Sequence, residues 1–561
     1  MSAGRRVFRI KVTLRSPFLF QGLDLAGHGF DASAHRDEDG CIIIPGDHLR
    51  GHLRHAIAAL TGGFDSDECK ALFGTESPEV PPGKERNRPA RGAILLSDLK
   101  GPTKEEIAIY HRIALDSTTG AAQEGSIQLI ELTAKIGEEV SFEGRLVLRP
   151  IPGLPADAVD LLTTALQLIP AMGALKSSGF GEVVADECSI QPDTRVDRGA
   201  ALLDGLSITV AFDRPLLVNA LRDDTNFFRG APIVPGAAIK GALAEALRDA
   251  GQDALLGEGF TRLRISHAFP LADDVLAGRA LPHALAAVKN DVRLATDDAV
   301  LAALCAHGTP GYPWDWKDDQ FAFARERLGR PGFDTKYDSR GRVEITDAGL
   351  AKESMLFVVQ PVRIRGVRWR FALDYNGCSP ELRHAVADVL KSGLDGLGRT
   401  GARMMVEGAS LPPEPPRCEA GAVLLMLETP ALLTDPTDPT RLFEQYARFF
   451  DTYADATLTD CWARQGDAGH YYGFRFPAYG THRYQPFELT EPGSVFALTV
   501  RDPAELNDLL RHGLPAVKLT GNVLKKLTYQ KCPFVPENGY GEISLLDAAG
   551  VDAMLKGAPH G

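Results

Sequence analysis

The sequence predicts an α+β protein built from repeated units, and two matching stretches support this prediction. In the first stretch, an alternating strand at 7–12 leads through a polar loop and a short apolar strand to the Pro-Gly pair 45–46, and a helix follows. The same order returns after residue 205, where a second Pro-Gly pair stands at 235–236. The two Pro-Gly pairs lie 190 residues apart, and a repeat of this length indicates that one structural unit occurs twice in tandem.

The composition is that of a globular protein. With 561 residues, 44% of them hydrophobic and 24% charged, the chain is long enough for about three or four domains and is not disordered, collagenous or coiled-coil. Its net charge of −13 counts against one broad nucleic-acid-binding surface but leaves room for local basic tracks. The eight cysteines stand singly, so we expect reduced thiols and no zinc or iron-sulfur site. Because no apolar segment is long enough for a membrane helix, a cytoplasmic protein is expected.

The Pro-Gly pair has a physical role in each copy. Proline fixes the backbone where the strand stops, and glycine allows the helix to approach the sheet closely. Asp47 is expected to cap the N-terminus of the first helix. A helix start of this kind presents backbone N–H groups to which a phosphate can bind.

Glycine-rich loops close the repeats. Amphipathic helices expected at 158–169 and 382–390 are followed by glycine-rich segments at 172–183 and 393–403, and a shorter version stands at 537–543. Glycines mixed with lysine, arginine and hydroxyl groups suit backbone that lies against phosphates. A single loop of this kind could equally be an ordinary turn.

The repeats predict how the chain is divided. We expect a first unit at 1–198 and a second at 199–410, the second carrying an insertion at about 270–340. A Pro-rich linker then leads to a reduced third unit at 421–561, which has an opening strand and a closing glycine loop but no Pro-Gly helix start.

The order of these motifs, together with the segments 92–98, 112–122 and 137–145, resembles the RAMP superfamily of CRISPR-associated proteins. The first repeat is most similar to the crRNA-binding backbone subunit of type III effector complexes, and the likeness weakens along the chain. The resemblance implies tandem RRM-like (ferredoxin-like) units. It also implies crRNA and target RNA as ligands, and other type III effector subunits as partners.

The loop at 27–40 carries the candidate for catalysis. It resembles the loop of backbone subunits that cut target RNA with a divalent metal such as Mg²⁺, with Asp31 at the position of their aspartate and Arg36-Asp37 at that of a following pair. A carboxylate there could bind a metal or accept the proton of a 2′-hydroxyl, so Asp31 is the candidate catalytic residue and metal ligand. It could instead cap a turn. Asp223 and Asp224, in the corresponding loop of the second repeat, are further candidates.

The candidate RNA contacts come from the helix after the first Pro-Gly pair, from the glycine loops and from runs of arginine. Solvated surface faces would explain any single run. The residues expected to bind RNA are His48, Arg50, Arg54, Lys176, Ser177, Ser178, Gly179, Phe180, Gly181, Lys240, Arg363, Arg365, Arg399, Thr400 and Arg403.

The resulting hypothesis is a subunit of a type III CRISPR-Cas effector that binds crRNA and cleaves complementary target RNA through Asp31. Three alternatives stay open from the sequence. The chain could be a non-catalytic scaffold that binds crRNA, or a guide-processing ribonuclease that uses His28 or His35. It could also be a repeat-built interaction protein whose glycine loops bind no RNA.

Overall fold

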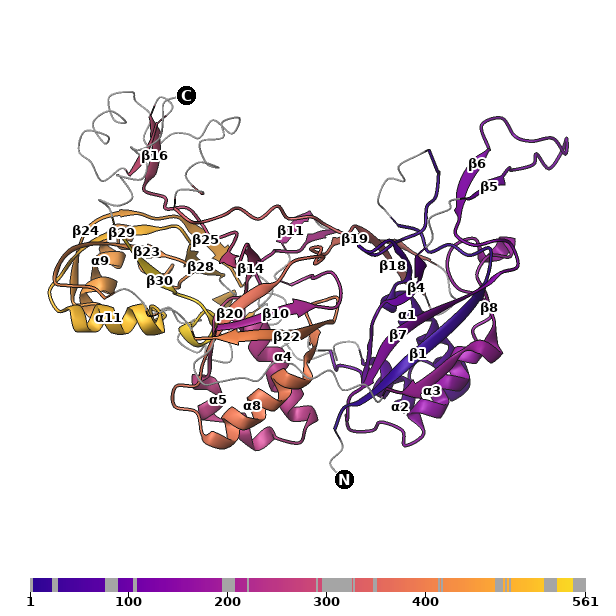
Figure 1. Ribbon diagram of the computed structural model, residues 1–561, viewed down its shortest axis with the longest axis horizontal. Helices are drawn as coiled ribbons and strands as arrows, with labels where there is room; N and C mark the ends of the chain where they lie inside the picture. The colour runs from indigo at the N-terminus through magenta and orange to yellow at the C-terminus, as the bar shows by residue number, and fades with distance from the viewer. Residues whose placement is uncertain are drawn as a thin grey trace.

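The computed structural model shows three units in a row, with the first and third at the two ends (Figure 1). It describes residues 4–22, 29–75, 89–103, 108–193, 207–218, 221–224, 226–288, 291–294, 325, 328–346, 351–411, 414, 417–469, 478–479, 482–483, 486–518 and 532–547. Each unit contains an antiparallel sheet with helices packed against it. The predicted α+β fold of repeated ferredoxin-like units is confirmed.

The first unit has a sheet of order β2-β4-β7-β1-β8, in which β3 also pairs with β7 and β9 with β1. With α1 after β1 and α3 after β7, this is the β-α-β-β-α-β arrangement of a ferredoxin-like unit. Its elements are β1 (Arg6–Arg15), β2 (Cys41–Ile44), α1 (Gly46–Thr61), α2 (Asp67–Phe73), β3 (Ile94–Leu96), β4 (Leu99–Thr103), β5 (Ala108–Arg112), β6 (Gln128–Leu132), β7 (Glu139–Leu148), α3 (Ala158–Gln167), β8 (Glu182–Val183) and β9 (Ser189–Pro192).

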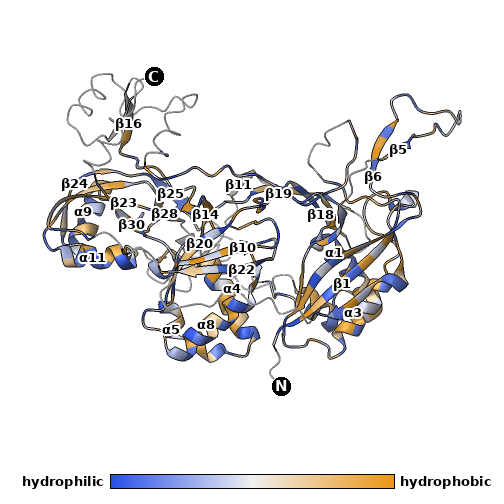
Figure 2. Cartoon of the chain, viewed as in Figure 1, coloured by the Kyte–Doolittle hydropathy of each residue, from blue (hydrophilic) through white to orange (hydrophobic). Residues whose placement is uncertain are grey.

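Alternating side chains place β1 against the core. Phe8, Ile10, Val12 and Leu14 are all buried, and polar and apolar residues alternate along its ribbon (Figure 2). The intervening cations are neutralised by acids of the same unit: Lys11 Nζ lies 3.0 Å from Glu187 Oε2, for example. These pairs favour the interpretation of the β1 arginines and lysine as a solvated strand face.

The helix α1 starts as predicted at the Pro-Gly pair, with one correction. A Cβ on Gly46 would lie 2.5 Å from the carbonyl oxygen of Ser97, so only glycine allows this approach of helix to sheet. Asp47 is not the N-cap, because Pro45 holds that position and Asp47 lies in the first turn. The Gly46 N–H donates instead to Asp98 Oδ1 at 2.8 Å.

The second unit repeats the arrangement, with a sheet of order β15-β14-β20-β10-β22-β21 and α4 and α8 against it. Its main elements are β10 (Ser207–Phe212), α4 (Gly236–Asp249), α5 (Glu258–Arg262), β13 (Arg264–Ile265), β14 (Phe269–Ala272), β15 (Val275–Leu276), β20 (Trp369–Asp374), α8 (Pro380–Ser392), β21 (Leu394–Leu397) and β22 (Ala402–Ser410). The short apolar strand that the sequence suggested directly before the Pro-Gly pair 235–236 does not form. Val234 makes only an isolated bridge to Ala268.

Two further sheets extend from the second unit. One has the order β11-β12-β19-β18 and reaches the first unit (Figure 1), and the other pairs β16 with β17. Their strands are β11 (Leu221–Asp224), β12 (Phe227–Arg229), β16 (Leu285–Val288), β17 (Asp291–Leu294), β18 (Arg340–Ile345) and β19 (Ala351–Gln360). The expected insertion at 270–340 therefore contains strands, and its residues 295–324 lie outside the described part of the chain.

The third unit has the same ferredoxin-like order, β24-β29-β23-β30, and is more complete than the sequence suggested. Its elements are β23 (Gly421–Leu427), α9 (Leu442–Tyr453), β24 (Ala456–Trp462), β25 (Gln465–Ala468), β26 (Ala478–Tyr479), β27 (His482–Arg483), β28 (Phe487–Thr490), β29 (Val495–Val500), α11 (Pro503–His512) and β30 (Ile543–Leu546). Across the described ranges, no helix is long and apolar enough to cross a membrane.

Candidate nucleic-acid interface

The start of α1 and the glycine loop of the second unit meet at a cavity of about 480 Å³. The helix contributes Gly46, Asp47 and Arg50, and the segment before β3 closes one side. From the second unit, Gly396, Gly398, Arg399, Thr400 and Gly401 line the cavity. Residues that are distant in sequence, and were predicted separately to bind RNA, therefore face one space.

Two arginines in this cavity directly contact uncharged groups, and Asp47, the acid near Arg50, is paired with Arg342. Arg50 donates to the carbonyl oxygen of Phe73, and its guanidinium lies 5.6 Å from the centre of that ring. The Arg399 guanidinium lies 4.6 Å from the ring centre of Phe228. Burial lowers the pKa of Arg50, and burial together with the nearby charge of Arg342 lowers that of Arg399. Because carbonyl and aromatic groups carry no net charge, an anionic ligand would be attracted to both arginines.

The acids of the cavity are paired across the two units. Arg149 Nη2 lies 2.5 Å from Glu245 Oε2, and Arg149 Nε lies 3.0 Å from Asp249 Oδ2. Arg145 pairs with Asp395, which also lies 3.6 Å from Arg5. These ion pairs between an arginine-rich face of the first unit and an acidic face of the second hold the two walls of the cavity together.

A buried hydroxyl also lines the cavity. Thr400 Oγ1 is inaccessible to solvent and has no hydrogen-bond partner within the described part of the chain. A buried polar atom without a partner is costly, so a rotation of the side chain that turns this hydroxyl into the cavity would let a ligand supply the missing hydrogen bond.

The second and third units also meet where a helix start after a Pro-Gly pair faces the closing glycine loop of the next unit. This junction, however, is closed. A Cβ on Gly236 would lie 2.6 Å from the carbonyl oxygen of Asn538, so the closing loop of the third unit lies directly on the start of α4. Lys240 is only 5% exposed and donates to the carbonyl oxygen of Thr261 at 2.9 Å. His267 Nδ1 accepts from the Gly236 N–H at 3.3 Å, and its ring packs against Tyr540. The expectation that Lys240 binds RNA is therefore corrected: Lys240 stabilises a junction.

The glycine loop of the first unit divides into an exposed and a buried part. Lys176, Ser177, Ser178 and Gly179 are exposed and accessible to a ligand. Phe180 is 1% exposed and packs against Tyr110, so it is a core residue and not an RNA contact. Gly181 is also structural, because a Cβ there would lie 1.8 Å from the carbonyl oxygen of Met172.

The remaining candidates on α1 have different surroundings. His48 Nε2 accepts from the Gly173 N–H at 3.1 Å, and burial with the charge of Lys176 lowers its pKa to about 4. This ring therefore anchors the glycine loop through Nε2, and in its neutral form the proton is on Nδ1, so donation to RNA from Nδ1 stays a prediction. Arg54 is exposed and lies over the ring of Phe64, so it stays a candidate for phosphate contact.

The other predicted arginines are spread over the second unit. Arg363 and Arg365 line a second cavity of about 370 Å³ between the first two units, and Arg365 contacts Glu38 and Asp39 of the first. Arg403 is 7% exposed and donates to the carbonyl oxygen of Ser392 at 2.8 Å, so it is structural.

Asp31 is exposed, and its loop contacts β6. Its Oδ2 accepts from the Leu129 N–H at 2.7 Å, while its own N–H donates to the Leu129 carbonyl oxygen at 2.8 Å. The other carboxylate oxygen is without a hydrogen-bond partner among the described residues. Asp223 and Asp224 lie in β11, and their side chains are outside the described part of the structure.

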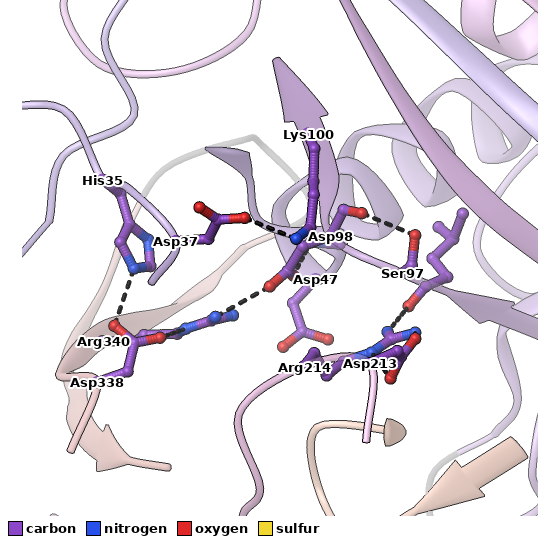
Figure 3. Close-up of polar contacts among 12 residues, drawn as sticks. His35, Asp37, Asp47, Ser97, Asp98, Lys100, Asp213, Arg214, Asp338 and Arg340 are labelled. Atoms are coloured by element: carbon purple, nitrogen blue, oxygen red, sulfur yellow. Dashed lines mark hydrogen bonds and ion pairs between the residues drawn. The ribbon is translucent and has the colours of Figure 1, made fainter. Parts of the chain in front are cut away.

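The side chains of the residues after Asp31 contact both the first and the second unit. Arg36 pairs with the buried Glu131 of β6. Asp37 accepts from the backbone N–H groups of the turn that precedes β2 and lies 2.7 Å from Lys100 Nζ. His35 contacts Asp338 of the second unit (Figure 3). His28, the other histidine of this loop named above, lies outside the described residues.

The sequence missed a chain of buried polar contacts between the first two units. Arg340 of β18 lies between Asp338 and Asp98, and Arg214 donates to the carbonyl oxygen of Leu96 at 2.7 Å (Figure 3). These partners are far apart in sequence, so only the docking of the two units brings them together. Asp98 lies in the segment 92–98 that the sequence singled out, but no local pattern links it to the Gly46 N–H, which is 52 residues away.

Comparison with known proteins bears on the first unit. A model of the RAMP superfamily matches residues 11–184. The first unit is therefore similar to this superfamily over most of its length. No curated protein matches the chain.

Two chains of solved structures are similar to parts of the protein. One comes from the cryo-EM structure of the Type III-B Cmr-beta bound to cognate target RNA and AMPPnP, with 13% identity, a TM-score of 0.30, and coverage of 54% of this chain and 87% of that chain. The other comes from the Type III-B Cmr-beta bound to cognate target RNA, with 17% identity, a TM-score of 0.24, and coverage of 34% of this chain and 61% of that chain.

Proposed function

We propose that the protein is a subunit of a type III CRISPR-Cas effector, that it binds guide crRNA in the cavity between its first two units, and that it cleaves complementary target RNA at the Asp31 loop. The observation that carries the proposal is the convergence of Arg50, Arg399 and Thr400 from two units on one cavity. The RAMP match of the first unit supports the assignment to CRISPR effectors.

The cavity suits a single-stranded RNA backbone. Arg50 and Arg399 supply positive charge, the Thr400 hydroxyl would supply a hydrogen bond once its side chain turns into the cavity, and the glycines of the 396–401 loop let backbone approach phosphates closely. Since these groups recognise phosphate and sugar and not base edges, sequence specificity would come from base pairing between guide and target.

The proposed cleavage reaction needs a carboxylate beside the scissile phosphate. The Asp31 carboxylate would accept the proton of a 2′-hydroxyl as that oxygen attacks the adjacent phosphorus. The bond from phosphorus to the 5′-oxygen then breaks, and the leaving oxygen takes a proton from water, which leaves a 2′,3′-cyclic phosphate and a 5′-hydroxyl end. The contact between Oδ2 and Leu129 would fix the orientation of the carboxylate, and Oδ1 would face the substrate.

Among the described residues of this loop, no protein-only metal site forms. No group of three or more His, Cys, Asp or Glu side chains in the described ranges is placed to hold a metal ion. Glu131 is hydrogen-bonded to the backbone just after Asp31, but its carboxylate already pairs with Arg36 and accepts from the Ala34 N–H. If a divalent cation such as Mg²⁺ binds here, Asp31 would be its ligand among the described residues, and RNA and water would supply further ligands.

The scaffold alternative is the second candidate, and one contact favours it. Asp31 Oδ2 caps the backbone of Leu129, which is what a purely structural aspartate would do. The guide-processing alternative named His28 or His35 as the residue that cuts RNA. The His35 ring is buried and hydrogen-bonded to Asp338, which counts against His35 in that role.

The test is cleavage of target RNA by the assembled effector that contains Asp31→Asn. Asparagine keeps an oxygen for the Leu129 N–H but cannot accept the substrate proton, so the cleavage rate should fall by about 100-fold or more while guide RNA is retained. The matched control is Asp186→Asn, at an exposed aspartate of the 3-10 helix Ala185–Glu187. Unchanged cleavage by Asp31→Asn would favour the scaffold.

A further inference from the structure

The Asp31 loop is held on one side by its own unit. Glu131 Oε2 accepts from the Ala34 N–H at 2.8 Å, and Glu131 also pairs with Arg36. The Glu131 N–H donates to the Ala32 carbonyl oxygen at 2.9 Å, so β6 fixes the backbone directly after Asp31. On the other side, the His35 N–H donates to the Phe20 carbonyl oxygen at 2.6 Å and the His35 carbonyl oxygen accepts from the Ile43 N–H at 3.1 Å, so the first unit fixes the His35 backbone and leaves its side chain to contact another element.

That other element belongs to the second unit. His35 Nε2 lies 3.0 Å from Asp338 Oδ1, and each side chain is only 6% exposed. Asp338 Oδ2 accepts from Arg340 Nε at 2.7 Å, and Arg340 Nη2 donates to Asp98 Oδ2 at 2.9 Å. Asp98 Oδ1 then accepts from the Gly46 N–H. One continuous chain of contacts thus joins the Asp31 loop to the start of α1 through two residues of the second unit (Figure 3).

Charges alternate along this chain. Burial raises the pKa of Asp338, but the hydrogen bond from His35 and the charge of Arg340 outweigh burial and bring the pKa to about 2. Burial likewise opposes the charge of Arg340, and the carboxylates of Asp98 and Asp338 raise its pKa above the usual value. Removing one member would leave a buried charge without its partner, so the contacts form or fail together.

We propose that Asp338 is a positioning residue for the Asp31 loop, and that Arg340 holds Asp338 in place. The inference rests on the proposed function, since it assigns Asp338 to the cleavage reaction through His35. Asp31 is four residues before His35, so a loop released from Asp338 would move the carboxylate away from the scissile phosphate. A misplacement of about 1 Å can lower a rate by about 100-fold. The first unit would then cleave only when the second unit is docked on it.

The experiment compares effectors assembled with guide RNA and carrying either the natural chain or Asp338→Asn. Asparagine keeps the shape of Asp338 but loses the charge that Arg340 requires. The rate constant at saturating target should fall by about tenfold or more, whereas the target concentration for half-maximal rate and the amount of guide retained should stay within about twofold. Hydrogen exchange of the backbone at 29–41 should become faster.

Conservative replacement of His35 provides the rescue. In His35→Gln the side-chain amide can still donate to Asp338, whereas in His35→Leu no donor remains. We expect His35→Gln to keep a cleavage rate within about threefold of the natural chain, and His35→Leu to match Asp338→Asn. This pattern requires a hydrogen bond and would not follow from the loss of packing alone.

The control is Asp274→Asn, the same chemical change at an exposed carboxylate that pairs with Arg368 at 3.1 Å, and it should leave both measurements unchanged. Normal cleavage or normal exchange in Asp338→Asn would overturn the inference. The proposed function fails by a different result, unchanged cleavage in Asp31→Asn, and the exchange rate of the loop then still reports whether Asp338 holds it.

Discussion

Arg50 and Lys240 occupy the same position in the repeated motif, four residues after the glycine of a Pro-Gly pair, but their surroundings are opposite. Arg50 lines a cavity of about 480 Å³, whereas Lys240 is 5% exposed and donates to backbone carbonyls. The difference comes from the loop that faces each helix. The 396–401 loop of the second unit leaves space beside α1, while the closing loop of the third unit lies directly on α4. The motif thus determines the start of the helix, and the next unit determines whether a ligand can reach it.

The closed junction should be broken most strongly by Gly236→Ala. The added Cβ would lie 2.0 Å from the carbonyl oxygen of Ile265 and 2.6 Å from that of Asn538, and backbone atoms cannot rotate away. We expect a loss of about 3 kcal/mol in the free energy of unfolding, measured by chemical denaturation, and faster proteolytic release of the third unit.

Gly241→Ala is the matched control in the same helix. No atom lies within 4 Å of the added Cβ, so alanine should raise the stability by about 0.5–1 kcal/mol through its better helix propensity. Equal effects of the two replacements would contradict the assignment of Gly236 to the junction.

The two junctions should also differ in their response to acid. Burial lowers the pKa of His267 to about 4, below the value of about 6.5 in an unfolded chain. The unfolded chain therefore gains the proton first, and the stability that neutral His267 contributes is full above pH 6.5 and is lost as pH falls toward 4. At pH 5 the loss is about 2 kcal/mol. Asp338, with a pKa of about 2, keeps its charge over this range.

The measurement is the shift of the melting temperature between pH 7 and pH 5. His267→Gln, which can still accept from the Gly236 N–H, should show a smaller shift than the natural chain. Because His48, His52 and His283 also have lowered pKa values, the comparison with the variant isolates the contribution of His267. Identical shifts would show that this ring does not make the junction sensitive to acid.

The smallest effect concerns RNA binding at the open junction. Arg399→Gln should weaken guide RNA binding about fivefold and reduce the slope of log affinity against log salt by about 0.7, the value for one phosphate contact on a single strand. Fluorescence anisotropy at several salt concentrations measures both quantities. Lys240→Gln should leave the slope unchanged, since its amine faces carbonyl oxygens and not the cavity. A lower slope for Lys240→Gln would refute the contrast between the junctions.

Much of the fold was predictable because it depends on local patterns. The alternation of β1 and the Pro-Gly starts of α1 and α4 follow from residues that are close in sequence. The third unit was underestimated, because its first helix starts at Leu442 without a Pro-Gly pair although its sheet has the same strand order.

The site was predictable only in part, because residue type does not reveal depth. Arg50, Arg399 and Thr400 do line one cavity, but Phe180, Lys240 and Arg403 are buried in the packing of the units. The contacts of Asp338 with His35 and of Arg340 with Asp98 join residues 303 and 242 positions apart. No local pattern predicts such pairs, since the docking of the second unit on the first creates them.

The two walls of the cavity belong to one polypeptide, and this has a thermodynamic consequence. Had α1 and the 396–401 loop come from separate subunits, the fraction of assembled cavities would decrease on dilution. Within one chain, their docking is a unimolecular equilibrium at a fixed effective concentration, so it does not change with the amount of protein. Covalent linkage also fixes the ratio of the two walls at one to one, and every copy of the chain carries a matched pair.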